Sequence, residues 1–159
     1  MALRHQLIRT RRETVWAVLA DGSRYQDWVV GTVHSRPKDD NWPQLGSALA
    51  YTFRLGPWAL DGQTIVRCSE PPRRLELEID SGRLGTARIA LELRPWGEHT
   101  VVIADEHPLT GPSGRLHNAG VDMLLQLRHR RMLANLAKVA EDADQGEDAD
   151  QGGGEAGAR

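Results

Sequence analysis

The segment Leu116–Glu141 limits what this chain can fold into more than any other stretch does. It is the only segment long and periodic enough to be identified as a major helix from its residues alone. With a rotation of about 100° per residue, apolar side chains gather on one side of this helix. They are Val121, Leu125, Met132, Leu136 and Val139. A helix with one apolar side has to bury it, so we predict that the rest of the chain packs against this helix.

The residues before this helix alternate between two phases, as half-buried strands do. Ser47–Leu55 is the clearest case, with Leu49, Tyr51 and Phe53 in one phase. The other expected strands are Leu3–Ile8, Thr32–Arg36, Ala59–Cys68, Leu75–Asp80, Ala87–Arg94 and Thr100–His107. Short gaps between successive strands favour hairpins. We therefore predict an α+β fold with a curved antiparallel sheet of about seven strands around the long C-terminal helix.

Two short helices are expected between the first two strands. The first is Glu13–Ala20, and the second begins near Ser23 and continues through Trp28. Thr10 with Glu13, and Ser23 with Gln26, both match the capping-box pattern that starts helices. We expect this pair of helices to close one end of the sheet.

Composition indicates one folded domain over residues 1–141, followed by an acidic tail. From Glu141 to the end there are seven acidic residues and one arginine, and two copies of Glu-Asp-Ala-Asp-Gln-Gly. So little apolar surface does not offset the entropy of ordering, which predicts a disordered tail over 142–159. The remaining positive charge is spread thinly along the chain rather than concentrated with aromatic residues, so we expect no nucleic-acid partner.

The chain has no apolar run of the roughly 20 residues that a membrane helix needs. Its N-terminus lacks the apolar stretch of a signal peptide, and Cys68 is the only cysteine. These features predict a soluble cytoplasmic protein without stable membrane association.

Motifs for metal and cofactor binding are absent from the sequence. There is no GxSxG, P-loop, GxGxxG or HExxH motif. None of the six histidines pairs with a second histidine or a carboxylate at the helical spacing of a metal site. We therefore expect neither a metal nor a cofactor.

Several short motifs recur at the turns and packing positions of a known superfamily. They are Val15-Trp16-Ala17-Val18-Leu19-Ala20-Asp21, Tyr25 with Trp28, Trp42-Pro43-Gln44-Leu45-Gly46, Glu70-Pro71-Pro72-Arg73-Arg74-Leu75 and Glu106-His107-Pro108. With the order of elements, they make residues 1–141 resemble the SRPBCC superfamily. Its members include START-related lipid-transfer domains, birch-pollen-allergen-like proteins and polyketide cyclase/dehydrase-like proteins.

The resemblance implies a helix-grip fold with a cavity between the sheet and the long helix. Such cavities accept apolar or amphipathic small molecules, either lipid-like or polyketide-like. Members include carriers, sensors and enzymes, so the fold leaves the function open.

Strand and helix phases suggest which residues would line such a cavity. The expected ligand-binding residues are Tyr51, Phe53, Trp58, Thr64, Leu125, Arg128 and Met132, with Trp58 at the rim. Arg128 and His129 lie on the two shoulders of the apolar side of the helix. Arg128 then either extends its head group to solvent or meets an anionic or carbonyl group of a ligand.

The catalytic candidates are Asp105 and His107, which share the phase of Val101 on their strand. Together they would form an acid–base pair for dehydration or enolisation. The phase of this strand is ambiguous, and a shift of one residue would turn Glu106 inward instead.

Three functions remain open from the sequence. The first is binding of a small hydrophobic molecule, for transport or sensing. The alternative is a cyclase, aromatase or dehydratase that acts on a carbonyl substrate in the same cavity. The third is an interaction protein that uses the acidic tail or the surface around Met123 and Leu127, and the expected assembly is a monomer or a homodimer.

Overall fold

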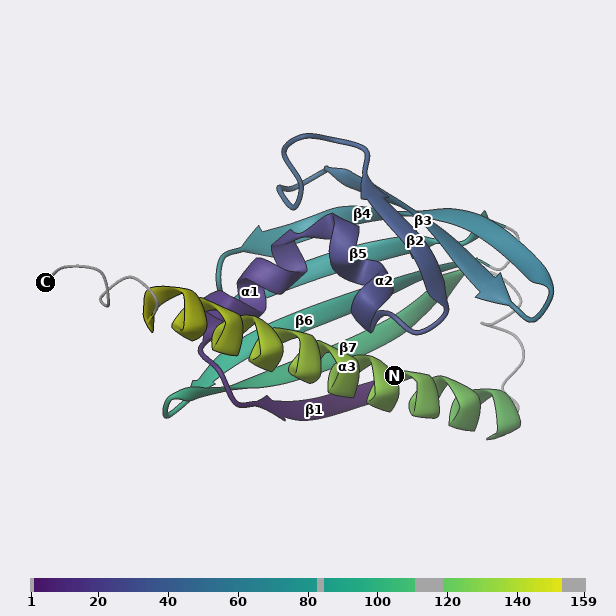
Figure 1. Cartoon of the computed structure of the whole chain (residues 1–159). Coiled ribbons are helices and arrows are strands. Elements are labelled where there is room, and N and C mark those ends of the chain that lie inside the picture. Colours follow the sequence, from purple (N-terminus) through teal and green to yellow (C-terminus); the bar gives the residue numbers. More distant parts are fainter. Residues whose placement is uncertain (1, 83–84, 111–118, 153–159) are drawn as a thin grey trace, which may run out of the picture.

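The computed structural model describes residues 2–82, 85–110 and 119–152 (Figure 1). The strands are β1 (Ala2–Ile8), β2 (Thr32–Pro37), β3 (Ala48–Leu55), β4 (Trp58–Glu70), β5 (Arg74–Asp80), β6 (Thr86–Trp96) and β7 (His99–Thr110). The helices are α1 (Arg12–Ala20), the 3-10 turn η1 (Gly22–Arg24), α2 (Tyr25–Trp28) and α3 (Ala119–Gly152). These elements follow the predicted order.

The strands form one seven-stranded antiparallel sheet in the order β1-β7-β6-β5-β4-β3-β2. From β2 to β7 each strand pairs with the next one in the sequence, as the short connections predict. β1 joins the far side of the sheet next to β7, with Leu3 opposite Asp105. The first and second strands of the chain are therefore its two edges.

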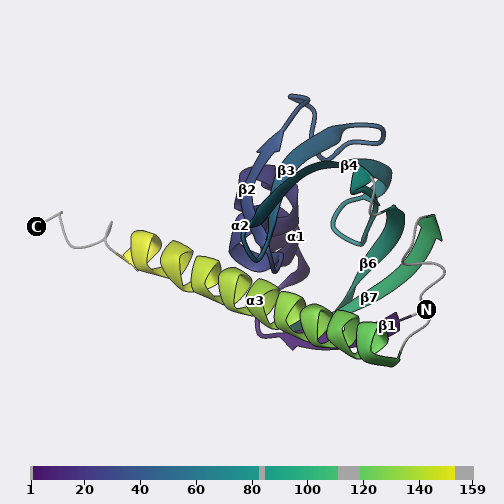
Figure 2. The same cartoon turned by 90° about the vertical axis from the view of Figure 1, so that its right-hand side faces the viewer.

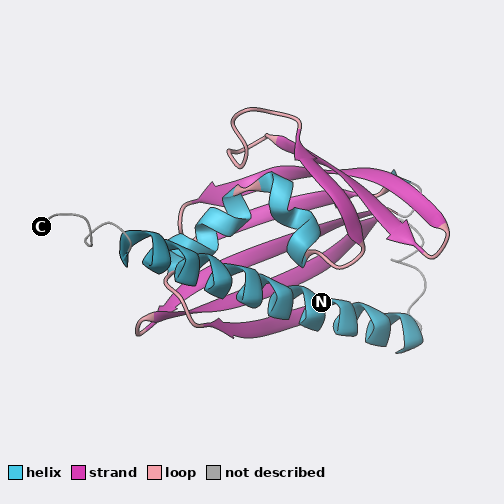
Figure 3. Ribbon diagram, in the orientation of Figure 1, coloured by secondary structure: helices cyan, strands magenta, loops and turns pink. Residues whose placement is uncertain are grey.

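The sheet curls around α3, as the two perpendicular views show (Figures 1 and 2). α3 contacts β1, α1 and α2, so the long helix lies across the open side of the curved sheet. The colouring by secondary structure shows the short helices α1 and α2 beside α3, over the same face of the sheet (Figure 3). This arrangement is the predicted helix-grip fold. No helix within the described part of the chain is long and apolar enough to cross a membrane.

One core joins the three helices to the inner face of the sheet. Its fully buried side chains include Ile8, Val15, Leu19, Val66, Leu75, Leu91, Leu93, Val102 and Leu136. At the closed end, the Tyr25 ring packs 4.8 Å from that of Trp28 and 5.7 Å from that of Trp42. The Tyr25 hydroxyl donates a hydrogen bond of 2.9 Å to the carbonyl oxygen of Leu19, which ties α2 to the end of α1.

The outer face of the sheet carries charge pairs between neighbouring strands. Glu78 on β5 accepts from Arg67 on β4 at 3.0 Å and from Arg88 on β6 at 3.3 Å. Glu78 and Arg88 are direct partners in the antiparallel register. The polar phase of these strands therefore faces outward, and the apolar phase faces α3.

Neither predicted capping box forms. α1 begins after Arg11, with no side-chain cap. Thr10 is buried instead, and its carbonyl oxygen accepts from the Thr100 hydroxyl at 2.8 Å. At the second site the Asp21 carboxylate caps the backbone amide of Ser23. In both places a tertiary or neighbouring contact replaces the local one.

α3 continues through Gly152, whereas we expected a disordered tail to begin at Asp142. The acidic repeat contains no proline, and alanine, glutamine and glutamate are good helix formers. The helix ends where Gly152 is followed by two more glycines, which favour non-helical backbone. The predicted start of this helix, between Ser113 and Asn118, and the last residues 153–159 lie outside the described residues.

Candidate functional site

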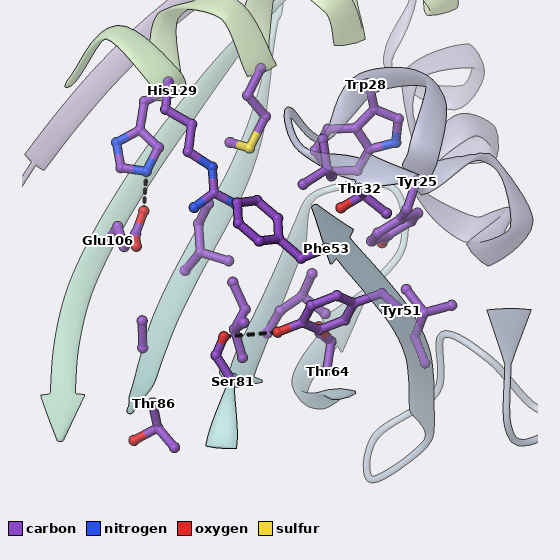
Figure 4. A pocket seen from close by; sticks show the side chains of 18 of the residues that line it. Tyr25, Trp28, Thr32, Tyr51, Phe53, Thr64, Ser81, Thr86, Glu106 and His129 are labelled. Carbon is purple, nitrogen blue, oxygen red and sulfur yellow. Dashed lines mark hydrogen bonds and ion pairs between the residues drawn. The ribbon is translucent and has the colours of Figure 1, made fainter. Parts of the chain in front are cut away.

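A cavity of about 450 Å³ lies between the inner face of the sheet, α2 and α3 (Figure 4). Most of its wall is apolar, formed by Trp28, Val29, Leu49, Phe53, Leu60, Leu77, Ile79, Ala87, Ile89, Leu91 and Met132. The polar side chains among its lining residues are those of Tyr25, Thr32, Tyr51, Asp61, Thr64, Ser81, Thr86, Glu106, Arg128 and His129. A few polar groups in an apolar wall are the usual composition of a small-molecule site.

β3 and β4 supply the predicted pair of aromatic residues and the predicted threonine. Tyr51 and Phe53 alternate toward the cavity from β3, as their strand phase predicts. Thr64 on β4 lies opposite Leu49 in the antiparallel register, so both face inward. Met132 reaches the same cavity from α3.

Two glycines make room for the aromatic side chains, a role that our sequence analysis missed. A Cβ atom at Gly62 would lie 2.4 Å from the Tyr51 hydroxyl oxygen and 2.7 Å from the Asp80 carbonyl oxygen. At Gly31, where φ is +90°, a Cβ would lie 2.1 Å from the Phe53 ring. Gly62 stands directly opposite Tyr51 in the register. A glycine inside an otherwise regular strand pattern is a signal for such a close approach.

The Tyr51 hydroxyl is held by two neighbours at one side of the cavity. Its oxygen lies 2.9 Å from the Ser81 hydroxyl oxygen and 3.3 Å from the Asp80 carbonyl oxygen (Figure 4). Burial raises the pKa of Tyr51 above its ordinary value, while the hydrogen bond from Ser81 and the charge of Arg128 oppose this rise. Tyr51 therefore stays protonated at neutral pH and offers a hydroxyl group to the cavity.

Arg128 extends from α3 into the cavity, as one of the two sequence interpretations expected. Its guanidinium carbon lies 4.9 Å from the centroid of the Phe53 ring. This is the geometry of a cation–π contact, which stabilises the charge without neutralising it. Arg130 and Arg131, further along the same helix, are exposed instead.

His129 and Glu106 form the most buried charged contact of the cavity. The Nε2 atom of His129 on α3 contacts the Oε2 atom of Glu106 on β7, and the two side chains are only 9% and 21% exposed (Figure 4). The pair is ionic when the imidazole is protonated. A carboxylate and an imidazole in contact can share a proton, so this pair brings together two groups that are capable of acid–base chemistry.

The inward position of Glu106 corrects the phase that we assigned to β7. Asp105 and His107 do not line the cavity. They contact each other at 3.1 Å with side chains 32% and 44% exposed, on the other face of the strand. Ile89 on the inner face of β6 lies opposite Glu106, and antiparallel partners share a face. The shift of one residue, considered above as the alternative, is what the structure contains.

One expected ligand-binding residue, Trp58, does not join the wall. Trp58 begins β4 with 68% of its surface exposed and is not among the lining residues. The alternation of β4 carries Leu60 to the cavity instead. The side chain of Leu125 lies outside the described residues, as do those of Met123 and Leu127.

Among the side chains that the structure describes, no three histidine, cysteine or acidic groups come together as a metal site would need. Cys68 is a free thiol, and a β-bulge after Val66 places it opposite Glu76. Glu76 belongs to the outer phase of β5, so the Cys68 thiol lies on the outer face of the sheet, away from the cavity.

Solved structures with very different sequences share this fold. The crystal structure of Ara h 8.0201 matches with a TM-score of 0.69 at 8% identity, over 87% of this chain and 95% of that chain. Protein TTHA0849 from Thermus thermophilus matches with a TM-score of 0.68 at 14% identity, over 89% and 97% of the two chains.

A third match is StfQ, a di-domain ARO/CYC protein from the steffimycin biosynthetic pathway. Its TM-score is 0.69 at 12% identity, and the match covers 91% of this chain but 46% of StfQ. At such low identity these matches show the fold alone. No curated protein matches the chain significantly by sequence. The family described as "Polyketide cyclase / dehydrase and lipid transport" matches residues 4–141, and the chain therefore belongs to this family of the SRPBCC superfamily.

Proposed function

We propose that this protein binds an apolar or amphipathic small molecule, lipid-like or polyketide-like, in the cavity between the sheet and α3. The observation that carries the proposal is the cavity itself, with about 450 Å³ of space and a mainly apolar wall. Small-molecule sites usually have volumes of about 300–1,000 Å³ and a few convergent polar groups. We further propose that the protein acts as a cytoplasmic carrier or sensor of this molecule.

Filling the cavity tests this proposal directly. Ala87 lines the cavity from β6, whereas Ala90 on the same strand belongs to the opposite phase and does not line it. Ala87→Phe should weaken binding of a fluorescent apolar probe such as 1-anilinonaphthalene-8-sulfonate at least about tenfold, because the new ring occupies ligand space. Ala90→Phe adds the same ring on the other face and should leave the affinity close to that of the wild type.

Native mass spectrometry of the purified protein provides the second measurement. A co-purified small molecule that survives in the wild type and Ala90→Phe but is lost in Ala87→Phe would support a ligand in the cavity. Equal probe affinity in all three proteins would contradict the proposal, because binding would then occur outside the cavity.

The contact between Glu106 and His129 favours a second candidate function, an enzyme of cyclase, aromatase or dehydratase type. In this function Glu106 accepts a proton from the carbon next to a substrate carbonyl, and the electron pair of that C–H bond moves onto the carbonyl oxygen. His129 holds the carboxylate and shares its proton. The Tyr51 hydroxyl, which donates its proton to the Asp80 carbonyl oxygen at 3.3 Å, turns to donate it to the developing oxyanion instead.

Deuterium exchange tests the second function without knowledge of the natural substrate. A bound aromatic β-ketoester in D₂O should exchange its acidic C–H faster with the wild type than with Glu106→Gln, by about 100-fold or more if the pair acts as a general base. His107→Gln, at the partly exposed pair on the other face of β7, should exchange like the wild type. Equal exchange rates for the wild type and Glu106→Gln would contradict the enzymatic function and leave the binding proposal intact.

A further inference from the structure

The lining of the cavity holds one cation without a carboxylate partner in the part of the chain that the structure describes. Glu106 contacts His129, and the Asp61 carboxylate accepts from the Thr52 hydroxyl at 2.8 Å. No described carboxylate lies within ion-pair distance of Arg128. Six other arginines, Arg24, Arg67, Arg73, Arg74, Arg88 and Arg94, are paired with acidic side chains. Exposed arginines such as Arg54 and Arg131 also have no ion pair with a described side chain, but they lie in water, whereas Arg128 lies partly buried in the cavity wall. A charge in a mainly apolar cavity is costly unless a counter-charge or water meets it.

From this arrangement we propose that the ligand carries a carboxylate at one end, which Arg128 binds, and an apolar body that fills the rest of the cavity. The inference rests on the proposed ligand-binding function and names its ligand class, an amphipathic carboxylic acid. The shared chemistry is the carboxylate, and the body is either an alkyl chain or an aromatic ring system.

The contact with Phe53 leaves the binding edge of Arg128 available. The aromatic ring lies against the guanidinium carbon at 4.9 Å, so the contact uses the group near its centre. Five N–H donors surround the planar guanidinium and match the two oxygens of a carboxylate. Gly31 provides the space for the Phe53 ring, so the backbone at this glycine helps to hold the ring against the Arg128 guanidinium.

Tyr51 and Ser81 place hydroxyl groups on the same side of the cavity. The charge of Arg128 acts on the Tyr51 hydroxyl, which places the two groups in one electrostatic environment. The Tyr51 oxygen also joins the Ser81 hydroxyl at 2.9 Å (Figure 4). A carboxylate bound at Arg128 therefore has hydroxyl groups nearby for its remaining lone pairs.

The remaining wall suits the apolar body of such a ligand. Leu49, Leu77 and Leu91 line the cavity and are at most 3% exposed, so they form its deeper part. Arg128 is only partly buried, which places the charged group nearer to solvent than these leucines. An amphipathic acid that binds with its carboxylate at Arg128 thus keeps its charge close to water and buries its apolar part.

Matched acids and alcohols separate the head group from the body. The probes are dodecanoic acid with dodecanol, and 9-anthracenecarboxylic acid with 9-anthracenemethanol, measured by tryptophan fluorescence at pH 7.5. The wild type should bind the acid of at least one pair about tenfold more tightly than the alcohol, since a charge-assisted contact is strong in a desolvated site. This preference should decrease at high salt.

Variants on α3 assign the preference to one residue. Arg128→Gln should lose the preference for the acid while binding the alcohol within about threefold of the wild type, because only the charge is removed. The control is Arg131→Gln on the exposed side of the same helix, which should behave like the wild type. If Arg128→Gln does not fold, Arg128→Lys keeps the charge but lacks the planar fork, and should reduce the preference at least about threefold.

The outcomes distinguish this inference from the proposal beneath it. Equal affinity of the wild type for acid and alcohol, or a preference that persists in Arg128→Gln, would overturn the carboxylate assignment and leave the binding function standing. Failure of every acid and alcohol to bind the wild type would overturn both.

Discussion

The imidazole of His129 on α3 contacts the carboxylate of Glu106 on β7 inside the cavity, so this contact joins the long helix to the inner face of the sheet. Both side chains are largely buried, and the two residues belong to separate segments of the sequence. The contact is therefore a tertiary interaction between α3 and β7 as well as the proposed site of acid–base chemistry.

Loss of the contact between Glu106 and His129 should destabilise the protein. Glu106→Gln should lower the free energy of unfolding by about 1–3 kcal/mol, because His129 is left without its charged partner in a buried site. Urea unfolding at pH 6.5 measures the change. His107→Gln is the matched control: it removes the histidine of a more exposed pair on β7, worth about 0–1 kcal/mol. Equal losses in the two variants would contradict the structural role of the buried contact.

The two tyrosines should titrate above their usual range. Burial raises the pKa of Tyr25 and Tyr51, whereas the unfolded chain releases these protons near pH 10. The folded state therefore holds more protons above that pH, and the free energy of unfolding should fall as pH rises beyond about 10. Absorbance at 295 nm follows the phenolates. A wild-type curve that coincides with free tyrosine would contradict the burial of both hydroxyls, and Tyr51→Phe isolates the contribution of Tyr25.

Substitution of Gly62 should disturb the cavity, whereas substitution of Gly146 should not. A Cβ at Gly62 meets both the Tyr51 ring and the Asp80 backbone, so Gly62→Ala should cost about 1–3 kcal/mol and weaken ligand binding. Gly146 has open space around its Cβ position on α3. There Gly146→Ala should increase the helical circular-dichroism signal at 222 nm, since alanine favours a helix by about 1 kcal/mol. A neutral Gly62→Ala would show that Tyr51 moves without cost.

The end of α3 should be dispensable after the last contacts with the sheet. Ala140 is fully buried, and the Glu141 carboxylate accepts from the backbone amide of Arg9 at 2.9 Å. Removal of residues 142–159 should change the free energy of unfolding by less than about 0.5 kcal/mol, because mainly exposed helix is lost. Removal from Leu136 onward also takes away core side chains and should prevent cooperative unfolding in urea. A large loss from the shorter truncation would place the end of the domain beyond Glu141.

Local pattern was sufficient to predict most of the fold. In β3 and β5 apolar and polar residues alternate, and such strands have only one face that can be buried. The resemblance to a known superfamily then supplied the arrangement of the sheet around α3. The prediction of a capping box at Thr10 was wrong because this residue contacts Thr100, 90 positions away. A local motif carries no information about such a distant contact.

The candidate site was harder to predict because its key strand has no alternation where it matters. Val101–Ala104 is apolar at every position, so pattern alone does not decide which face is buried. The feature that determines the inward face of β7 is the hairpin turn between β6 and β7. Trp96 pairs with His99 around a two-residue loop that contains Gly97 at a φ of +61°. A two-residue hairpin sets the register of both strands, and it places Glu106 beside the buried Ile89.

The unclosed sheet has a consequence for the range of molecules that this architecture can serve. In a closed barrel, strand number and stagger set the diameter. Here β1 and β2 end the sheet as separate edges, and no backbone hydrogen bonds join them to each other. The width of the cavity therefore depends on the side chains of α3 that face the gap between these two edges. Substitutions on this face of α3 can change which ligands fit, while every strand pairing is kept.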